Sequence, residues 1–182
     1  MPLSPDVADV VQVPVDCDDP QTDGSTCGPN SASRLLRAYG HAVAYAAMVA
    51  LMRRHSWTIH FGLGSTPRAL AQAMRTIRPE TELQQDTPFE RILELVADQK
   101  LVLALIREER SIWALGSFPA LHWITVYGFE QSTETIFMRD TNGQDRHECY
   151  RDFRDRWEWL LPWGIPRWAL DAAGVRGRTI IY

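Results

Sequence analysis

The sequence predicts an α+β domain in which the helices come first and the sheet follows. Between residues 27 and 97, apolar residues recur three and four positions apart, which is the spacing of amphipathic helices. After residue 100 the apolar stretches are short and bounded by polar turns, which is typical of strands. Helices followed by strands, without regular alternation, favour α+β over α/β architecture.

The 182 residues are the usual size of one domain, so we expect one core. We divide this domain into an N-terminal arm, a helical half and a sheet half that ends in a Trp-rich segment, over residues 1–20, 21–100 and 101–182. The arm alternates apolar and polar residues from Val11 to Val15, but Pro14 has no amide hydrogen to donate to a sheet. It therefore offers one edge strand at most.

Four helices are expected in the helical half. From Cys27 to Tyr39 the apolar residues follow the helical spacing, and Gly40 provides a stop. An Ala-rich stretch over 42–54 ends in two arginines, whose positive charge suits a helix C-terminus. The third and fourth helices begin at Thr66-Pro67 and Thr87-Pro88, where proline can occupy the first turn, and the fourth also has a capping-box pattern.

The sheet half is expected to contain four strands and one helix. The strands are predicted over 101–106, 122–129, 135–139 and 179–182, and the helix over 150–161. The segment 107–120 is predicted to be a loop, either a lid or a plain surface loop. Four of the seven tryptophans lie between Trp157 and Trp168. We expect them to form core and cleft wall rather than a sugar-binding or membrane-surface patch.

Composition excludes several classes of function. The net charge of −4 argues against nucleic acid as a partner, and no apolar run is long enough to span a membrane. The chain starts without a secretory signal pattern, and three widely spaced cysteines fit a reducing compartment. We therefore expect a protein that is cytoplasmic in the producing cell, or exported without a standard signal. The sequence leaves the oligomeric state open.

Metal and disulfide chemistry are the weaker alternatives. His147 and Cys149, with the distant Cys17, lack a paired C-x-x-C spacing, so we expect no metal site. A disulfide between Cys17 and Cys149 stays open as an alternative. No organic cofactor is expected.

Cys27 is the candidate nucleophile. It stands at the start of the first helix, where the positive end of the helix dipole favours the thiolate. Gly28 follows it, and we expect this glycine to leave room for a substrate beside the sulfur. Six residues before Cys27, the side-chain amide of Gln21 could donate to an oxyanion. Taken singly, Cys27 could be a buried structural cysteine and Gln21 a solvated loop residue.

His122 and Asp140 are the candidate base and its orienting carboxylate. His122 opens one expected strand and Asp140 ends the next. If the hairpin turns at Gln131, the two residues face each other directly, about 5 Å apart at Cβ. A register shift of one residue would separate them. The rival bases are His55 and His60, from the helical half and its following loop.

Together these residues supply a nucleophile, a base, a base orienter and an oxyanion donor for acyl transfer. At this point the sequence resembles the papain-like cysteine peptidases, and in particular the branch that includes the bacteriocin-processing, double-glycine leader peptidases. The matching blocks are Gln21 with Cys27-Gly28-Pro29-Asn30-Ser31-Ala32, the strand that ends Val126-Tyr127-Gly128-Phe129, and Arg139-Asp140-Thr141-Asn142-Gly143.

The resemblance implies a helical half carrying the cysteine, packed on an antiparallel sheet that carries the histidine and the aspartate. It implies that Cys27, His122 and Asp140 are catalytic and that Gln21 donates to the oxyanion. It also implies a reaction that requires no metal or organic cofactor. Thr26 departs from the pattern, because these peptidases usually have an acidic residue before the cysteine. Residues 41–65 and the Trp-rich segment have no counterpart.

The leading hypothesis is a bacterial thiol peptidase that cleaves a peptide or protein through a Cys-His-Asp triad. A glutamine deamidase or transglutaminase-like protein modifier, acting as an effector or toxin, would use the same residues on a side-chain amide. The third hypothesis is a catalytically inactive papain-like binding module, against which the intact Cys27, His122 and Asp140 count.

Overall fold

The computed structural model describes residues 8–16, 20–21, 23–56, 64–112, 116–158 and 175–182. This part of the chain contains five helices, α1 (Cys27–Ala38), α2 (Tyr45–His55), α3 (Pro67–Arg75), α4 (Phe89–Ala97) and α5 (Tyr150–Trp157). It also contains the strands β1 (Val10–Gln12), β2 (Leu83–Gln84), β3 (Val102–Ile112), β4 (Gly116–Glu130), β5 (Thr135–Arg139), β6 (Asp145–Cys149) and β7 (Ile180–Ile181).

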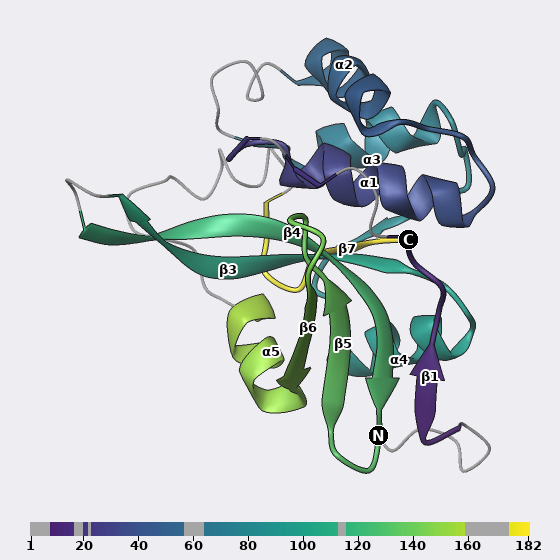
Figure 1. The fold of residues 1–182 in the computed structure, drawn as a ribbon, viewed down its shortest axis with the longest axis vertical. Helices are drawn as coiled ribbons and strands as arrows, with labels where there is room; N and C mark the ends of the chain where they lie inside the picture. Colours follow the sequence, from purple (N-terminus) through teal and green to yellow (C-terminus); the bar gives the residue numbers. More distant parts are fainter. Residues whose placement is uncertain (1–7, 17–19, 22, 57–63, 113–115, 159–174) are drawn as a thin grey trace.

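The strands form one antiparallel sheet with the order β2-β7-β3-β4-β5-β6, and β1 pairs with β4 beside this path. In Figure 1, α1, α2 and α3 lie together above the sheet, and α4 and α5 lie lower against the strands. This is the predicted α+β architecture, with the helices that come first in the chain packed on a sheet that comes later. No helix in the described part is both long and apolar enough to cross a membrane.

The predicted helices are confirmed with small changes at their ends. In α1 the apolar stripe is fully buried and the helix packs on β4. The third helix begins as expected, because the Thr66 side chain accepts a hydrogen bond from the Ala69 amide. The expected capping box of α4 is wrong, because Pro88 is the cap residue and no side chain caps the helix.

The sheet is larger than predicted. The expected loop over 107–120 is wrong, because Val102–Ile112 pairs with Gly116–Val126 along its whole length, in a ribbon that projects on the left of Figure 1. Backbone pairing continues here through polar residues, which the apolar pattern could not reveal. Strands β2 and β6 were not predicted, since β2 has two residues and β6 is a polar edge strand. The arm supplies β1, as expected.

The core joins both halves of the chain. Trp157 is fully buried and stacks on Phe153, with ring centroids 6.0 Å apart, so this tryptophan belongs to the core as expected. The other three tryptophans of the cluster, Trp159, Trp163 and Trp168, lie outside the described residues. Helix α5 ends at Trp157 with Glu158 as its C-cap residue, so the expected end at 161 is wrong.

Candidate active site

Cys27 is the first residue of α1, and only 4% of its surface is exposed. The first turn of this helix carries no acidic side chain, so the positive end of the helix dipole acts on the thiol without local competition. The cap residue Thr26 hydrogen bonds to the hydroxyl of Tyr45 in α2. This contact ties the start of α1 to a segment for which the resemblance offered no counterpart.

Gly28 has a different role from the one expected. A Cβ atom at this position would lie 2.6 Å from Ser65 Oγ and 3.2 Å from Trp123 Cδ1. The space beside the helix is therefore filled by the segment before α3 and by β4, and it is not kept open for a substrate. Trp123 holds the same segment, because its indole Nε1 donates to the Ser65 carbonyl at 3.1 Å.

His122 and Asp140 are brought together by a β-bulge. On the turn side Gly128 pairs with Phe137, but beyond Tyr127 the register shifts and Val126 pairs with Met138. Without this extra residue, Asp140 would follow opposite Thr125, whose side chain points to the other face of the sheet from His122. With the bulge, Asp140 follows opposite Ile124, on the face of His122.

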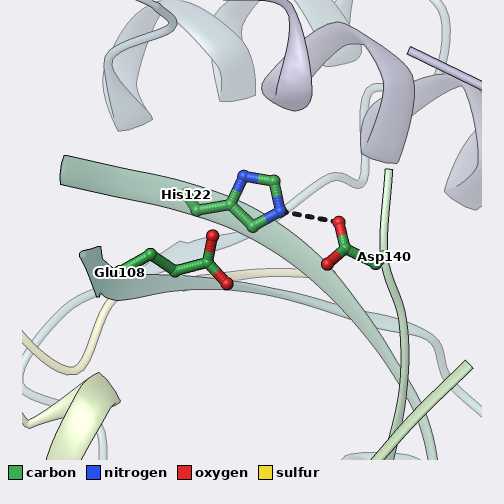
Figure 2. A group of neighbouring side chains, drawn as sticks. All are labelled: Glu108, His122 and Asp140. Carbon is green, nitrogen blue, oxygen red and sulfur yellow. Dashed lines mark hydrogen bonds and ion pairs between the residues drawn. The ribbon is translucent and has the colours of Figure 1, made fainter. Parts of the chain in front are cut away.

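The predicted turn at Gln131 and the direct opposition of His122 and Asp140 are therefore wrong. Glu130 pairs with Thr135, so the turn spans residues 131–134. His122 and Asp140 are diagonal neighbours, and they still meet, because His122 Nε2 lies 2.9 Å from Asp140 Oδ1 (Figure 2). This is the contact that sequence reasoning predicted, reached by a different register.

The His122–Asp140 pair is largely buried and its two pKa values move apart. Burial by itself lowers the pKa of His122, but its interactions with Asp140 and then with Cys27 raise that pKa to about 10. Burial by itself raises the pKa of Asp140, but its bonds to His122, Arg146 and the Thr141 amide hold the pKa well below its usual range. The pair is therefore an imidazolium and a carboxylate at neutral pH, with Cys27 as a neighbour of the ring.

Gln21 lies beside this pair through its backbone. Its amide donates to the Thr141 carbonyl at 2.7 Å, which anchors the loop next to Asp140. Its side-chain amide donates to the carbonyl of Asp23. Gln21 as an oxyanion donor therefore stays a prediction, and it requires the side chain to exchange this partner for the substrate.

Two arginines hold Asp140, and sequence reasoning missed both. Arg34 in α1 is fully buried and donates from Nη1 to the Asp140 carbonyl at 2.5 Å. Arg146 in β6 donates from Nη1 to Asp140 Oδ2 at 3.0 Å. The signal for Arg34 was a charged residue seven positions after Cys27, close to the buried face of the helix. Arg146 gave no signal, because β6 was not predicted.

The other candidates lie elsewhere. His55 is the last residue of α2, and His60 is outside the described residues. His147 packs against Phe137, with the rings tilted and their centroids 4.7 Å apart. Cys149 is a free cysteine among the described residues, and Cys17, its alternative partner, lies outside them. Among described residues, the group with the geometry of a metal site is Glu108, His122 and Asp140, whose ligand atoms lie within 4.8 Å of one another (Figure 2). The guanidinium of Arg146 pairs with both of its carboxylates.

Comparison with known proteins supports the fold and identifies the family. The fold is similar to a crystal structure described as that of a C39-like peptidase from Bacillus anthracis, with a TM-score of 0.63 and 14% identity, over 94% of this chain and 96% of that one. No curated protein sequence gives a significant match. Residues 10–160 match the model of the Peptidase_C39 like family, and this range includes β1–β6, Cys27, His122 and Asp140. The chain therefore belongs to the Peptidase_C39 like family, a branch of the papain-like cysteine peptidases.

Proposed function

We propose that this protein is a thiol peptidase that cleaves a peptide or protein substrate through Cys27, His122 and Asp140. The observation that carries the proposal is the buried contact of 2.9 Å between His122 Nε2 and Asp140 Oδ1, beside a cysteine at a helix N-terminus. Family membership supports peptide-bond hydrolysis over the modification of side-chain amides.

The two ring nitrogens of His122 have separate roles. Nε2 donates to Asp140, because an ionised carboxylate can only accept, and this bond fixes the orientation of the ring. Nδ1 is buried and makes no hydrogen bond of standard geometry within the described residues. It is therefore the nitrogen that exchanges a proton with the Cys27 thiol.

The reaction follows from these positions. The Cys27 thiolate attacks the carbonyl carbon of the scissile bond, and the electron pair moves to the carbonyl oxygen. The Cys27 amide and the Gln21 side chain stabilise this oxyanion. As the carbon–nitrogen bond breaks, His122 Nδ1 gives its proton to the leaving amine. Water, deprotonated by the same nitrogen, then attacks the thioester and releases the acid and the thiol.

Selective alkylation tests the nucleophile. Iodoacetamide should label Cys27 faster than Cys149 at pH 6, because ordinary thiols are mostly protonated at this pH. The Cys27→Ala variant should lose this labelling and all turnover, whereas Cys149→Ala is the matched control and should keep both. Intact-mass analysis of labelled protein gives the rates. Faster labelling of Cys149 at pH 6 would contradict the assignment.

A second experiment separates the peptidase from its alternatives. Candidate proteins are incubated with the wild type and with Cys27→Ala, and their intact masses are compared. Backbone cleavage by the wild type alone supports the peptidase. A gain of about 1 Da per modified site would indicate a deamidase instead, because exchange of an amide NH₂ for OH adds this mass. A Cys27 thiol that no peptide-based electrophile labels would favour the binding module.

A further inference from the structure

Arg146 lies at the centre of a charged cluster behind the His122–Asp140 pair. Its Nη1 contacts Asp140 Oδ2 at 3.0 Å and also pairs with Glu108, and its Nη2 contacts Glu148 at 3.1 Å. Arg156 of α5 closes the cluster, because it contacts Glu108 at 3.3 Å and Glu148 at 2.7 Å. Two arginines thus bind three carboxylates.

Glu108 connects this charged cluster to the candidate site, because its carboxylate lies close to His122 and Asp140. Glu108 lies on β3, and Figure 2 shows its carboxylate below the ring of His122, with the carboxylate of Asp140 beside the ring. Nitrogen and oxygen atoms of the three residues come within 4.8 Å of one another. His122 therefore has two carboxylates near it, and only Asp140 hydrogen bonds to the ring.

The two carboxylates differ in what holds them. Both oxygens of Asp140 are occupied: Oδ1 by His122 and the Thr141 amide, and Oδ2 by Arg146. Glu108 is bound by Arg146 and Arg156 through the same oxygen, Oε1. Arg146 contacts both carboxylates through Nη1, so its guanidinium bridges Glu108 and Asp140 and offsets their charge.

We propose that Arg146 is a positioning residue of this site, which locks the second oxygen of Asp140 and pairs with Glu108, so that His122 hydrogen bonds to one carboxylate and not two. This inference rests on the proposed function, since it concerns the same His122–Asp140 pair. It assigns a role to β6, the polar edge strand that no sequence pattern predicted.

The chemical consequence concerns the acidity of the imidazolium. An imidazolium that must protonate a leaving amine works best when its pKa is near the working pH. Loss of the Arg146 cation would leave Asp140 without this ion pair and Glu108 with Arg156 alone, so the negative charge near the ring would increase and His122 would hold its proton more tightly. The charged and titratable groups around His122 come from four elements. They are Cys27 on α1, Glu108 on β3, Asp140 after β5 and Arg146 on β6. These groups are in turn contacted by Arg34, Glu148 and Arg156.

The test is a titration of His122 in the full chain by NMR of its ring nitrogens. It is done in a Cys27→Ala background, because the thiol itself raises the pKa of His122. Arg146→Gln should raise the pKa of His122 by about one unit, the size expected when a charge is removed within about 4–6 Å. Arg146→Lys keeps the charge and should stay closer to the parent. Arg139→Gln is the matched control, since Arg139 pairs with Asp145 and not with the Asp140 carboxylate.

A double variant isolates the role of Glu108. Adding Glu108→Gln to Arg146→Gln should return the pKa of His122 toward the parent value, which a merely structural role of Arg146 would not produce. Three results would overturn the proposal. The pKa of His122 could stay unchanged or fall in Arg146→Gln, it could shift equally in Arg146→Lys and Arg146→Gln, or it could fail to return toward the parent value in the double variant. None of these readings requires Cys27 to be a nucleophile, so they are independent of the alkylation test of the peptidase.

Discussion

The two sides of the candidate site are held in place by different means. Cys27 owes its position to a helix start, which is a local feature of about a dozen residues. The His122–Asp140 contact depends on a register shift in β4 and on arginines from two distant parts of the chain, Arg34 and Arg146. The comparison teaches that a nucleophile can be recognised from neighbouring residues, whereas its base is assembled from non-local contacts.

The largest expected effect comes from removing the carboxylate on the non-local side. Asp140→Ala should lower the pKa of His122 by about one to three units, because it removes an opposite charge in direct contact with the ring. The loss of imidazolium should therefore begin about one to three pH units lower in Asp140→Ala than in the wild type, which an NMR titration of the His122 ring nitrogens measures. Asp145→Ala, two residues beyond the Asn142–Gly143 turn, is the control, and its His122 should titrate like that of the wild type.

The same pair gives a pH signature in stability. The pKa of His122 is raised, so its contribution is complete below the ordinary value of 6.5 and disappears as the pH rises through about 10. The pKa of Asp140 is lowered, so its contribution is complete above the ordinary value of 3.8 and disappears as the pH falls below it. The difference in unfolding free energy between wild type and Asp140→Ala should therefore be largest between these two values. A difference that is flat with pH would contradict this coupling.

A smaller effect is expected from the link between the two sides. Arg34 connects the helix of Cys27 to the Asp140 carbonyl, while its Nε and Nη2 are buried without a hydrogen bond. Arg34→Met keeps much of the volume and removes a poorly satisfied buried charge, so the melting temperature should not fall. The alkylation rate at pH 6 should fall by about tenfold, equivalent to one unit of pKa, because Asp140 loses a fixed partner.

A large fall in melting temperature with an unchanged alkylation rate would show that Arg34 serves the fold and not the site. Arg37 in the same helix provides the comparison, because it pairs with Asp16 of the arm and not with Asp140. Arg37→Met should lower stability slightly and leave the alkylation rate unchanged.

The smallest effect concerns the local side. Gly28→Ala should destabilise the protein by about 1–3 kcal/mol, the usual cost of overpacking, although alanine favours a helix more than glycine does. The reason is the Ser65 side chain, whose Oγ and Cβ would lie 2.6 and 2.7 Å from the new Cβ. Adding Ser65→Gly removes both atoms and should restore most of the loss. Thermal unfolding of the single and double variants measures this loss of stability and its recovery. If the double variant recovered no stability, the contact with Ser65 would not be the cause of the loss.

Several features of the fold could be predicted from the sequence because they depend on residues close together in the chain. The spacing of apolar residues located four of the five described helices, an Ala-rich stretch ending in two arginines indicated α2, and Thr66 with Pro67 marked the start of α3. The thiol position at the start of α1 also followed from adjacent residues. In each case neighbouring side chains determine the backbone through periodicity, capping or restricted torsion angles.

The remaining features were decided by tertiary structure. Polar residues in β3, β4 and β6 form strands because a neighbouring strand supplies their hydrogen bonds, and no apolar pattern marks such partners. The bulge at Tyr127 changes the face on which Asp140 lies, so a turn at a different place still brought Asp140 to His122. Arg34 and Arg146 reach Asp140 across 106 and 6 positions in the sequence, and their contacts exist only after the helix and the edge strand have packed around the pair.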